Sequence, residues 1–480
     1  MSKTSSSNPA VPSPAKSPAH RSPLALLVAG TFFMENLDAT IITPALPAMA
    51  RSFGAQPADL NLGVAVYALT VAIFIPASGW IAERYGARRV FGLAIAMFTL
   101  ASVLCGITET LWQFVAARAL QGMAGSLMVP VGRLAVLRGT EKRDLVTVIA
   151  TLTWPALVAP VLGPPLGGLL VDHAHWSWIF LLNVPLGIVA LAMVHRVVPH
   201  IAPDPARRFD AAGFAFMGLA LAALVGAAEA VSHSFDDWPP ALAAFALSGL
   251  FAGLGVRHLR RARHPLFRLD VLGIATFLAS IRGGTLFRMG VSAVPFLVPV
   301  MMQIGFGYSP FHSGLMLMAV FAGNVLIKPA TTPLLARFGF RPILVAGGIG
   351  NGVALAACAL FGPGTPAPVI AAVLFVGGAL RSVQFTAINT LSFSEVPQSH
   401  MADANTMAST FTPVAMGLGV TLGAVAWRMG EALSSGGAAA TPFRIAFVVV
   451  GVVTALATLD FARLDRSAGA EVASRGKARA

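Results

Sequence analysis

Long apolar runs follow one another along this chain, with short polar or basic segments between them. Runs of roughly 18 to 25 residues, wound as α-helices, are long enough to cross the hydrocarbon core of a bilayer. Charged residues make up 11% of the chain and hydrophobic residues 56%, whereas about a quarter of an ordinary soluble domain is charged. Because water is absent from the bilayer core, the backbone of each run must satisfy its own hydrogen bonds. The sequence therefore predicts an all-α integral membrane protein.

We expect fourteen membrane-spanning helices. The ninth run is long enough to bend or to lie partly at the interface, and Pro295 and Pro299 favour a break there. The predicted spans cover residues 24–47, 60–79, 90–107, 111–136, 147–170, 177–195, 211–230, 240–256, 273–303, 312–335, 343–361, 367–392, 402–427 and 443–462.

The basic residues are distributed unevenly between the two sides of the membrane. When alternate loops are counted from the amino-terminal tail, one side carries 24 of the 33 Lys and Arg residues, whereas the other carries Arg51 and Arg428. Short basic loops resist translocation, so we expect both termini in the cytoplasm and the chain in the cell's inner membrane. The net charge of +13 follows from this sidedness. It does not indicate a nucleic-acid surface, because the charges form no single stripe.

A short basic loop occurs twice. Gly79–Val90 returns in degenerate form at Thr332–Leu344, so that Arg84, Gly86 and Arg88 fall on Arg337, Gly339 and Arg341 at one offset of 253 residues. Arg118 and Gln121 likewise return as Arg381 and Gln384. Such duplication is typical of secondary transporters and predicts two pseudo-symmetric six-helix bundles with two helices inserted between them. The expected parts are a disordered tail (1–23), the first bundle (24–198), the insert (199–270), the second bundle (271–465) and a basic tail (466–480).

Several motifs occur together along the chain. They include Leu37–Pro47 in the first span, the loop at Gly79–Val90, Arg118–Gly125 in the fourth span, Gly163–Gly168 in the fifth, Trp176–Gly187 at the start of the sixth and Phe209–Gly213 at the start of the seventh. With these motifs the chain resembles the major facilitator superfamily, specifically its fourteen-span drug:proton antiporter branch, over nearly its whole length. The resemblance implies a proton-coupled exporter of small organic compounds that works by alternating access.

Glu35 and Asp38 lie three residues apart on one face of the first span. Two carboxylates in one dehydrated site cannot both ionise cheaply, so one of them is expected to hold a proton near neutral pH. By resemblance, Asp38 is the residue implicated in proton coupling, and Arg118 acts near it. A buried guanidinium needs a partner, for which Asp38 and Glu35 are the candidates. In the alternative interpretation, Asp38 and Arg118 form a purely structural pair and Glu35 faces a wet vestibule.

The loop and the fifth span carry two further candidate motifs. In the loop, Gly79 and Gly86 permit close approach and a tight turn, and four charged residues could pair with helix ends in one facing state and release them in the other. These four are Glu83, where the family usually has Asp, Arg84, Arg88 and Arg89. By resemblance, Gly163, Pro164, Gly167 and Gly168 mark antiporters, and the small residues permit a close helix crossing that could suppress leakage. The plainer alternatives are a topology-setting basic loop and simple helix packing.

Basic and amide side chains lie within the spans of the second half, where acids are nearly absent. Uncompensated cations facing a cavity attract anions, although Arg282 and Lys328 could instead extend to the membrane interface. Amides could bind a ligand or join helices. The candidate cavity residues are Gln121, Arg288, Gln303, Asn324, Arg381, Gln384 and Asn389.

No enzyme signal accompanies these features. The sequence contains no Gly-x-x-x-x-Gly-Lys-[Ser/Thr] motif, and its His residues show no metal-ligand spacing. We therefore expect no cofactor and no metal, with protons, a small-molecule substrate and lipid as partners. The sequence is compatible with a monomer. Interaction with accessory envelope proteins remains an open alternative. Two alternatives to drug export remain: export of an anionic metabolite or metal chelate through the intramembrane arginines, and a non-transporting membrane sensor built on a transporter fold.

Overall fold

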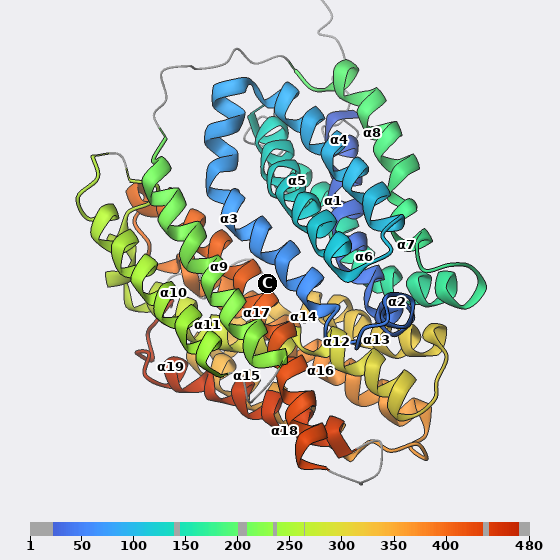
Figure 1. The fold of residues 1–480 in the computed structure, drawn as a ribbon. Helices are drawn as coiled ribbons and strands as arrows, with labels where there is room; N and C mark the ends of the chain where they lie inside the picture. The colour runs from blue at the N-terminus through green and yellow to red at the C-terminus, as the bar shows by residue number, and fades with distance from the viewer. Residues whose placement is uncertain are drawn as a thin grey trace, which may run out of the picture.

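The computed structural model is built from helices packed into one membrane-protein body (Figure 1). It describes residues 23–138, 145–199, 209–233, 238–263, 265–434 and 441–469, and within these ranges it contains no β-strand. The two predicted tails therefore lie almost entirely outside the described residues. So do many of the basic residues used to predict the orientation, including those at 139–144 and 200–208.

The prediction of fourteen spans is confirmed. Within the described residues, thirteen helical segments are individually long and apolar enough to cross a membrane, and a bent pair of helices, taken as one span, makes fourteen. The main helices are α1 (Pro23–Ile41), α2 (Leu46–Phe53), α3 (Asn61–Tyr85), α4 (Ala87–Gly106), α5 (Leu111–Arg138), α6 (Leu145–His173), α7 (Trp178–Leu181), α8 (Asn183–Val197), α9 (Ala211–His233), α10 (Trp238–Leu259), α11 (Ala275–Ser292), α12 (Val294–Val300), α13 (Pro310–Leu326), α14 (Lys328–Phe338), α15 (Phe340–Ala357), α16 (Ala367–Ser394), α17 (Met401–Leu433), α18 (Thr441–Leu456) and α19 (Thr458–Ala462).

Several spans are interrupted within the described residues. A 3₁₀ turn at Thr43–Ala45 separates α1 from α2, because Pro44 lacks the N–H that a continuous α-helix would use. The ninth span breaks at Ala293, just before Pro295, and ends in a π-helical turn at Met301–Gly305, in agreement with the expected bend. In the tenth span α13 and α14 meet at 53°.

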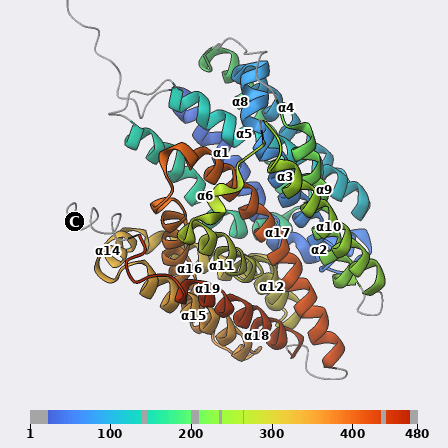
Figure 2. The same cartoon turned by 90° about the vertical axis from the view of Figure 1, so that its left-hand side faces the viewer.

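The helices form two bundles with an inserted pair. Helices α1–α8 make the first bundle (blue to green) and α11–α19 the second (yellow to red), as Figures 1 and 2 show from two sides. The inserted helices α9 and α10 pack on each other, and α9 also contacts α3 and α17. The predicted domain boundaries at residues 199 and 270 stay predictions.

The apolar cores differ between the two ends of the molecule. We call the end with the loops at Gly86 and Gly339 the basic end. At the opposite end one core cluster joins both bundles, with Leu46 and Phe180 from the first and Phe296 from the second. Toward the basic end each bundle has a core cluster of its own. The bundles are thus packed together at the opposite end and separately at the basic end.

Candidate functional site

Asp38 lies at the centre of a buried polar network contributed by four helices of the first bundle. Its Oδ2 accepts a hydrogen bond from Arg118 Nη1 at 2.7 Å, and its Oδ1 accepts from Gln121 Nε2 and Asn183 Nδ2, both at 2.8 Å. Ser102 Oγ accepts further bonds from the same Gln121 and Asn183 nitrogens, at 3.0 and 3.3 Å. All five side chains are buried. Three donors are directed at this one carboxylate, and Asp38 is the ion-pair partner of Arg118.

Tyr67 completes the enclosure of the ion pair. The guanidinium of Arg118 lies 4.2 Å from the centroid of the Tyr67 ring, which is within the range of a cation–π contact. Arg118 Nη1 also donates to Gln121 Oε1 at 2.6 Å, whereas its Nε is buried without a hydrogen-bond partner. The fourth-span arginine predicted to need a partner therefore has Asp38 as its acid.

Glu35 lies one turn away on α1 and outside this network. Its Oε2 is buried and makes no hydrogen bond. Gly125 of α5 faces this carboxyl group: a Cβ added there would come 3.5 Å from the Glu35 carboxyl carbon and 3.4 Å from the Tyr67 hydroxyl. Glu35 thus lies beside the Asp38–Arg118 pair and forms no ion pair with any residue that the structure describes, and burying it in ionised form would be costly.

A cavity of about 370 Å³ lies between the two bundles. Its walls combine apolar side chains such as Phe296 and Phe321 with polar groups from both bundles. The polar and charged lining residues are Asn36, Thr40, Thr43, Asn61, Tyr67 and Arg118 from the first bundle, and Ser292, Asn324 and Arg381 from the second. A mostly apolar cavity with a few convergent polar groups is typical of a small-molecule site. Among the described residues, α9 and α10 contribute nothing to its lining.

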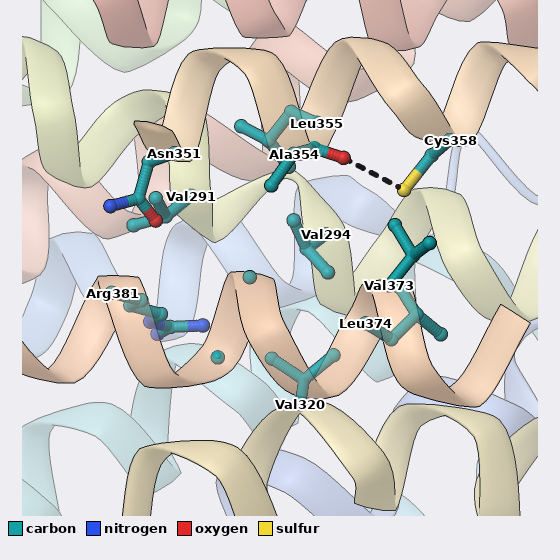
Figure 3. A pocket seen from close by; sticks show the side chains of 12 residues that line it. Val291, Val294, Val320, Asn351, Ala354, Leu355, Cys358, Val373, Leu374 and Arg381 are labelled. Carbon is teal, nitrogen blue, oxygen red and sulfur yellow. Dashed lines mark hydrogen bonds between the residues drawn. The ribbon is translucent and has the colours of Figure 1, made fainter. Parts of the chain in front are cut away.

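Arg381 is placed very differently from its sequence counterpart Arg118. It lines the large cavity, and its Nε and Nη1 are buried without hydrogen-bond partners. Within the described chain, Arg381 forms no ion pair with a carboxylate; its guanidinium lies 5.3 Å from the Phe385 ring centroid. Figure 3 shows Arg381 and Asn351 at one side of a second, small cavity of about 30 Å³, with Cys358 at the other.

Five of the other predicted cavity residues have hydrogen-bond partners within the protein. Arg288 Nη2 donates to Asn389 Oδ1 at 2.8 Å, and Gln384 Nε2 donates to the Leu344 carbonyl at 3.0 Å. Gln303 Nε2 donates to the Pro44 carbonyl at 3.0 Å and therefore links the bundles. Of the seven candidates, Asn324 and Arg381 line the large cavity, whereas Gln121, Arg288, Gln303, Gln384 and Asn389 do not.

The two copies of the basic loop are built alike. Gly86 has a φ of 88° and Gly339 a φ of 79°, a region that favours glycine. Arg88 donates to the carbonyl of His195 near the end of α8, and the equivalent Arg341 donates at 2.8 Å to the carbonyl of Ala462 at the end of α19. Each arginine thus caps the last helix of its own bundle, where carbonyls lack helical partners.

The other loop residues have less defined surroundings. Glu83 and Arg84 also have partners, and Arg89 is exposed. A Cβ at Gly79 would meet nothing within 4 Å. Of the two arginines that follow Gly86, Arg88 and Arg89, the structure thus gives a capping role to Arg88. The latch role of this loop stays a prediction.

The glycines of the fifth span lie where three helices cross. Side chains added at Gly163 or Gly167 would overlap α1 at Thr40 or Ile41, and one at Gly168 would overlap the α13 backbone at Pro310. In return, Gly314 of α13 faces the Pro164 carbonyl. This motif therefore brings α6 into backbone contact with both its own bundle and the other one. Its predicted effect on leakage stays a prediction.

Polar contacts join the bundles at the opposite end. Arg428 of α17 pairs with Asp59, which precedes α3, and both side chains are largely buried. The Phe311 backbone N–H donates to Asp172 Oδ2 at 3.0 Å, across the α6–α13 contact. Together with the Gln303 bond to Pro44, these contacts reinforce the shared core at that end.

Two buried asparagines of the site were not predicted from the sequence. Asn183 bonds Asp38, and it could have been found as the one amide in the apolar run that opens the sixth span. Asn61 lines the large cavity, is fully buried, and has neither amide atom hydrogen-bonded. Its position at the start of α3 gave no signal, because polar residues are common at helix ends. The described residues contain no cluster of three or more possible metal ligands.

The sequence is similar to a known protein family and to individual members of it. The sequence model of the Major Facilitator Superfamily matches residues 28–419 and again 281–479. The chain is 36% identical over 445 residues to the "Putative multidrug resistance protein MdtD" of Citrobacter koseri, covering 91% of this chain and 93% of that protein. It is 37% identical over 459 residues to the protein of the same name from Cronobacter sakazakii, covering 94% and 96%.

Solved structures share the fold at low sequence identity. The D-xylose-proton symporter matches with a TM-score of 0.63 at 14% identity, covering 93% of this chain and 98% of the symporter. The POT family transporter PepTSo matches with a TM-score of 0.64 at 14% identity, covering 94% of this chain and 99% of that transporter. Two bundles, a central cavity, the repeated loop and these matches lead to one conclusion: this multi-pass membrane protein belongs to the major facilitator superfamily.

Proposed function

We propose that this protein is a proton-coupled exporter of small organic compounds that binds its substrate in the cavity between the bundles. The observation that carries the proposal is the buried Asp38–Arg118 pair, beside which the buried Oε2 of Glu35 has no hydrogen-bond partner among the described residues. The names of the relatives support a multidrug-type substrate. The mostly apolar cavity, of about 370 Å³, has a size suited to such compounds.

The two carboxyl groups would divide the work of proton coupling. Asp38 accepts hydrogen bonds from three donors, so a proton arriving there would compete with Arg118. Glu35 has no such competitor and is the carboxyl group that can hold a proton in this state. A proton passing from Glu35 to Asp38 would release Arg118, which lines the cavity. The released guanidinium would then be exposed to the substrate site, and one facing state would be favoured over the other.

The packing of the bundles fits an inward-facing state. The shared core and the Asp59–Arg428 pair hold the bundles together at the opposite end. With the basic loops in the cytoplasm of a bacterial inner membrane, as the sidedness of the charges favours, the cavity would open toward the cytoplasm. Loading there would precede export, and each proton moving inward through 100 mV would supply about 2.3 kcal/mol.

Proteoliposomes containing a pH-sensitive dye can test the coupling. Adding a cationic substrate dye should cause a proton flux with the wild-type protein and none with Asp38→Asn, while Asp270→Asn, which changes an exposed acid, should behave as wild type. An undiminished proton flux with Asp38→Asn would overturn the proposal. A protein that moves neither protons nor any compound would instead favour the membrane sensor.

A second candidate function, export of organic anions, is favoured by Arg381. Its positive charge has no carboxylate partner in the described chain, whereas Arg118 in the same cavity is neutralised by Asp38. A substrate carboxylate or other acid could pair with the free nitrogens of Arg381. Uptake into inverted vesicles would distinguish the candidates: Arg381→Gln should abolish organic-anion uptake if anions are the substrate, and should preserve or improve dye uptake if cations are.

A further inference from the structure

A groove of about 370 Å³ lies on the outside of the second bundle, away from the cavity between the bundles. It forms where the bend between α13 and α14 turns α14 against α15 and α16. Phe338, Pro342 and Ala346 in its wall are exposed. Its wall is apolar, with Leu334 and Phe338 from α14, Pro342, Ile343 and Ala346 from α15, and Leu380 from α16.

A cation lies at the mouth of this groove. The guanidinium of Arg337 is exposed and lies 5.4 Å from the centroid of the Phe338 ring, which lines the groove. No carboxylate of the described chain forms an ion pair with Arg337. Arg341 is the second residue of α15, and Nη2 of its guanidinium donates to the Ala462 carbonyl.

The two copies of the basic loop differ in charge at this point. In the first bundle Glu83 precedes Arg84, whereas the equivalent position before Arg337 is Ala336. The second copy has therefore kept its arginines but has no acid at the position before Arg337. An apolar groove with an uncompensated cation at its mouth matches a molecule that has an apolar chain and an anionic head.

We infer that the groove between α14, α15 and α16 binds an anionic phospholipid, with one acyl chain in the groove and the phosphate on Arg337. The groove is on the exposed surface of a membrane-spanning bundle, at the end that carries the basic loops, so lipid reaches it directly from the bilayer. Bound lipid would fill the space that the bend of the tenth span leaves open. It would thereby support α14, which carries the second copy of the loop.

Photo-crosslinking of the full-length protein tests this inference. The protein is reconstituted into vesicles of phosphatidylethanolamine that contain a trace of phosphatidylglycerol with a photoreactive group on its acyl chain. Crosslinked peptides should map to residues 334–346 and 380–383. Arg337→Gln should lower the yield about fivefold, as expected for the loss of one basic residue at a membrane surface. Arg261→Gln, which removes an exposed arginine beyond α10, should leave the yield unchanged.

A second variant separates the acyl chain from the head group. Ala346→Trp fills the groove and keeps Arg337, so it should also prevent crosslinking at residues 334–346. Three outcomes would overturn the inference: equal labelling by a phosphatidylethanolamine probe, equal labelling of Arg337→Gln and wild type, or displacement of the lipid probe by a cationic dye. The last result would make the groove a substrate entrance.

Discussion

Replacing Asp38 by asparagine tests the buried network most directly. In the native protein the Asp38 carboxylate accepts hydrogen bonds from Arg118 at 2.7 Å and from Gln121 and Asn183 at 2.8 Å. An asparagine keeps one acceptor oxygen and replaces the other with an NH₂ donor. At least one of the three donors would then face another N–H group, and Arg118 would lose its counter-charge.

The magnitude follows from the burial of the pair. Both side chains are at most 1% exposed, and removing one partner of a buried ion pair costs about 3–5 kcal/mol. We therefore expect Asp38→Asn to lower the free energy of unfolding by about 3–5 kcal/mol. Unfolding in mixed detergent micelles, followed by tryptophan fluorescence and extrapolated to zero denaturant, measures this quantity.

Glu35→Gln is the matched control. It makes the same chemical change one turn away on α1, at a carboxyl group whose Oε2 has no hydrogen-bond partner. Its effect on stability should stay below about 1 kcal/mol, because no ion pair is lost. Adding Arg118→Gln to Asp38→Asn should recover part of the loss, since the unpaired cation is removed. Equal losses in the two single variants, or no recovery in the double variant, would refute the reasoning.

Three further predictions concern contacts that hold the helices together: an ion pair between the bundles, a close helix crossing and a helix cap. Asp59→Asn removes the ion pair with Arg428, so it should shift the equilibrium between the facing states about tenfold toward the outward-facing state. Spin-label distances between the bundles measure this shift, and unchanged distances would contradict the prediction. Gly314→Leu should abolish transport, because the added side chain would separate α6 from α13. The control Gly226→Leu, at a site with no neighbouring atom within 4 Å, should keep transport, and equal activities of the two variants would refute the packing argument. Arg88→Gln should speed hydrogen exchange in the last turn of α8 about tenfold and leave α19 unaffected; exchange at the native rate would refute its capping role.

The fold was predictable because it depends on few features of the sequence. Span number and order follow from hydropathy, and the duplication follows from a loop whose glycines need positive φ in both copies. The ends of spans were less predictable. The first span was expected to end at Pro47, yet helical structure continues to Phe53, because a short 3₁₀ turn accommodates Pro44 and Pro47 then lies in the first turn of α2, where a missing N–H costs little.

The site was predictable where a charge is costly and less so where a side chain is neutral. Arg118 in the middle of a span requires an acid, so its pairing with Asp38 could be expected. The amides Gln303 and Gln384 were expected in the cavity, but they bond to backbone carbonyls elsewhere. Helical spacing gives the face of a helix and not the neighbour that this face meets. Asn61, which also lines the cavity, was missed because polar residues are common at helix ends and its position at the start of α3 gave no signal.

The apolar core shared by the two bundles at the opposite end has a thermodynamic consequence. Any state that opens there must wet part of this core, and wetting apolar surface raises the heat capacity. The free-energy difference between the two facing states would then depend on temperature in a non-linear way. Because hydrophobic association weakens on cooling, a colder membrane would favour the state in which the core is parted.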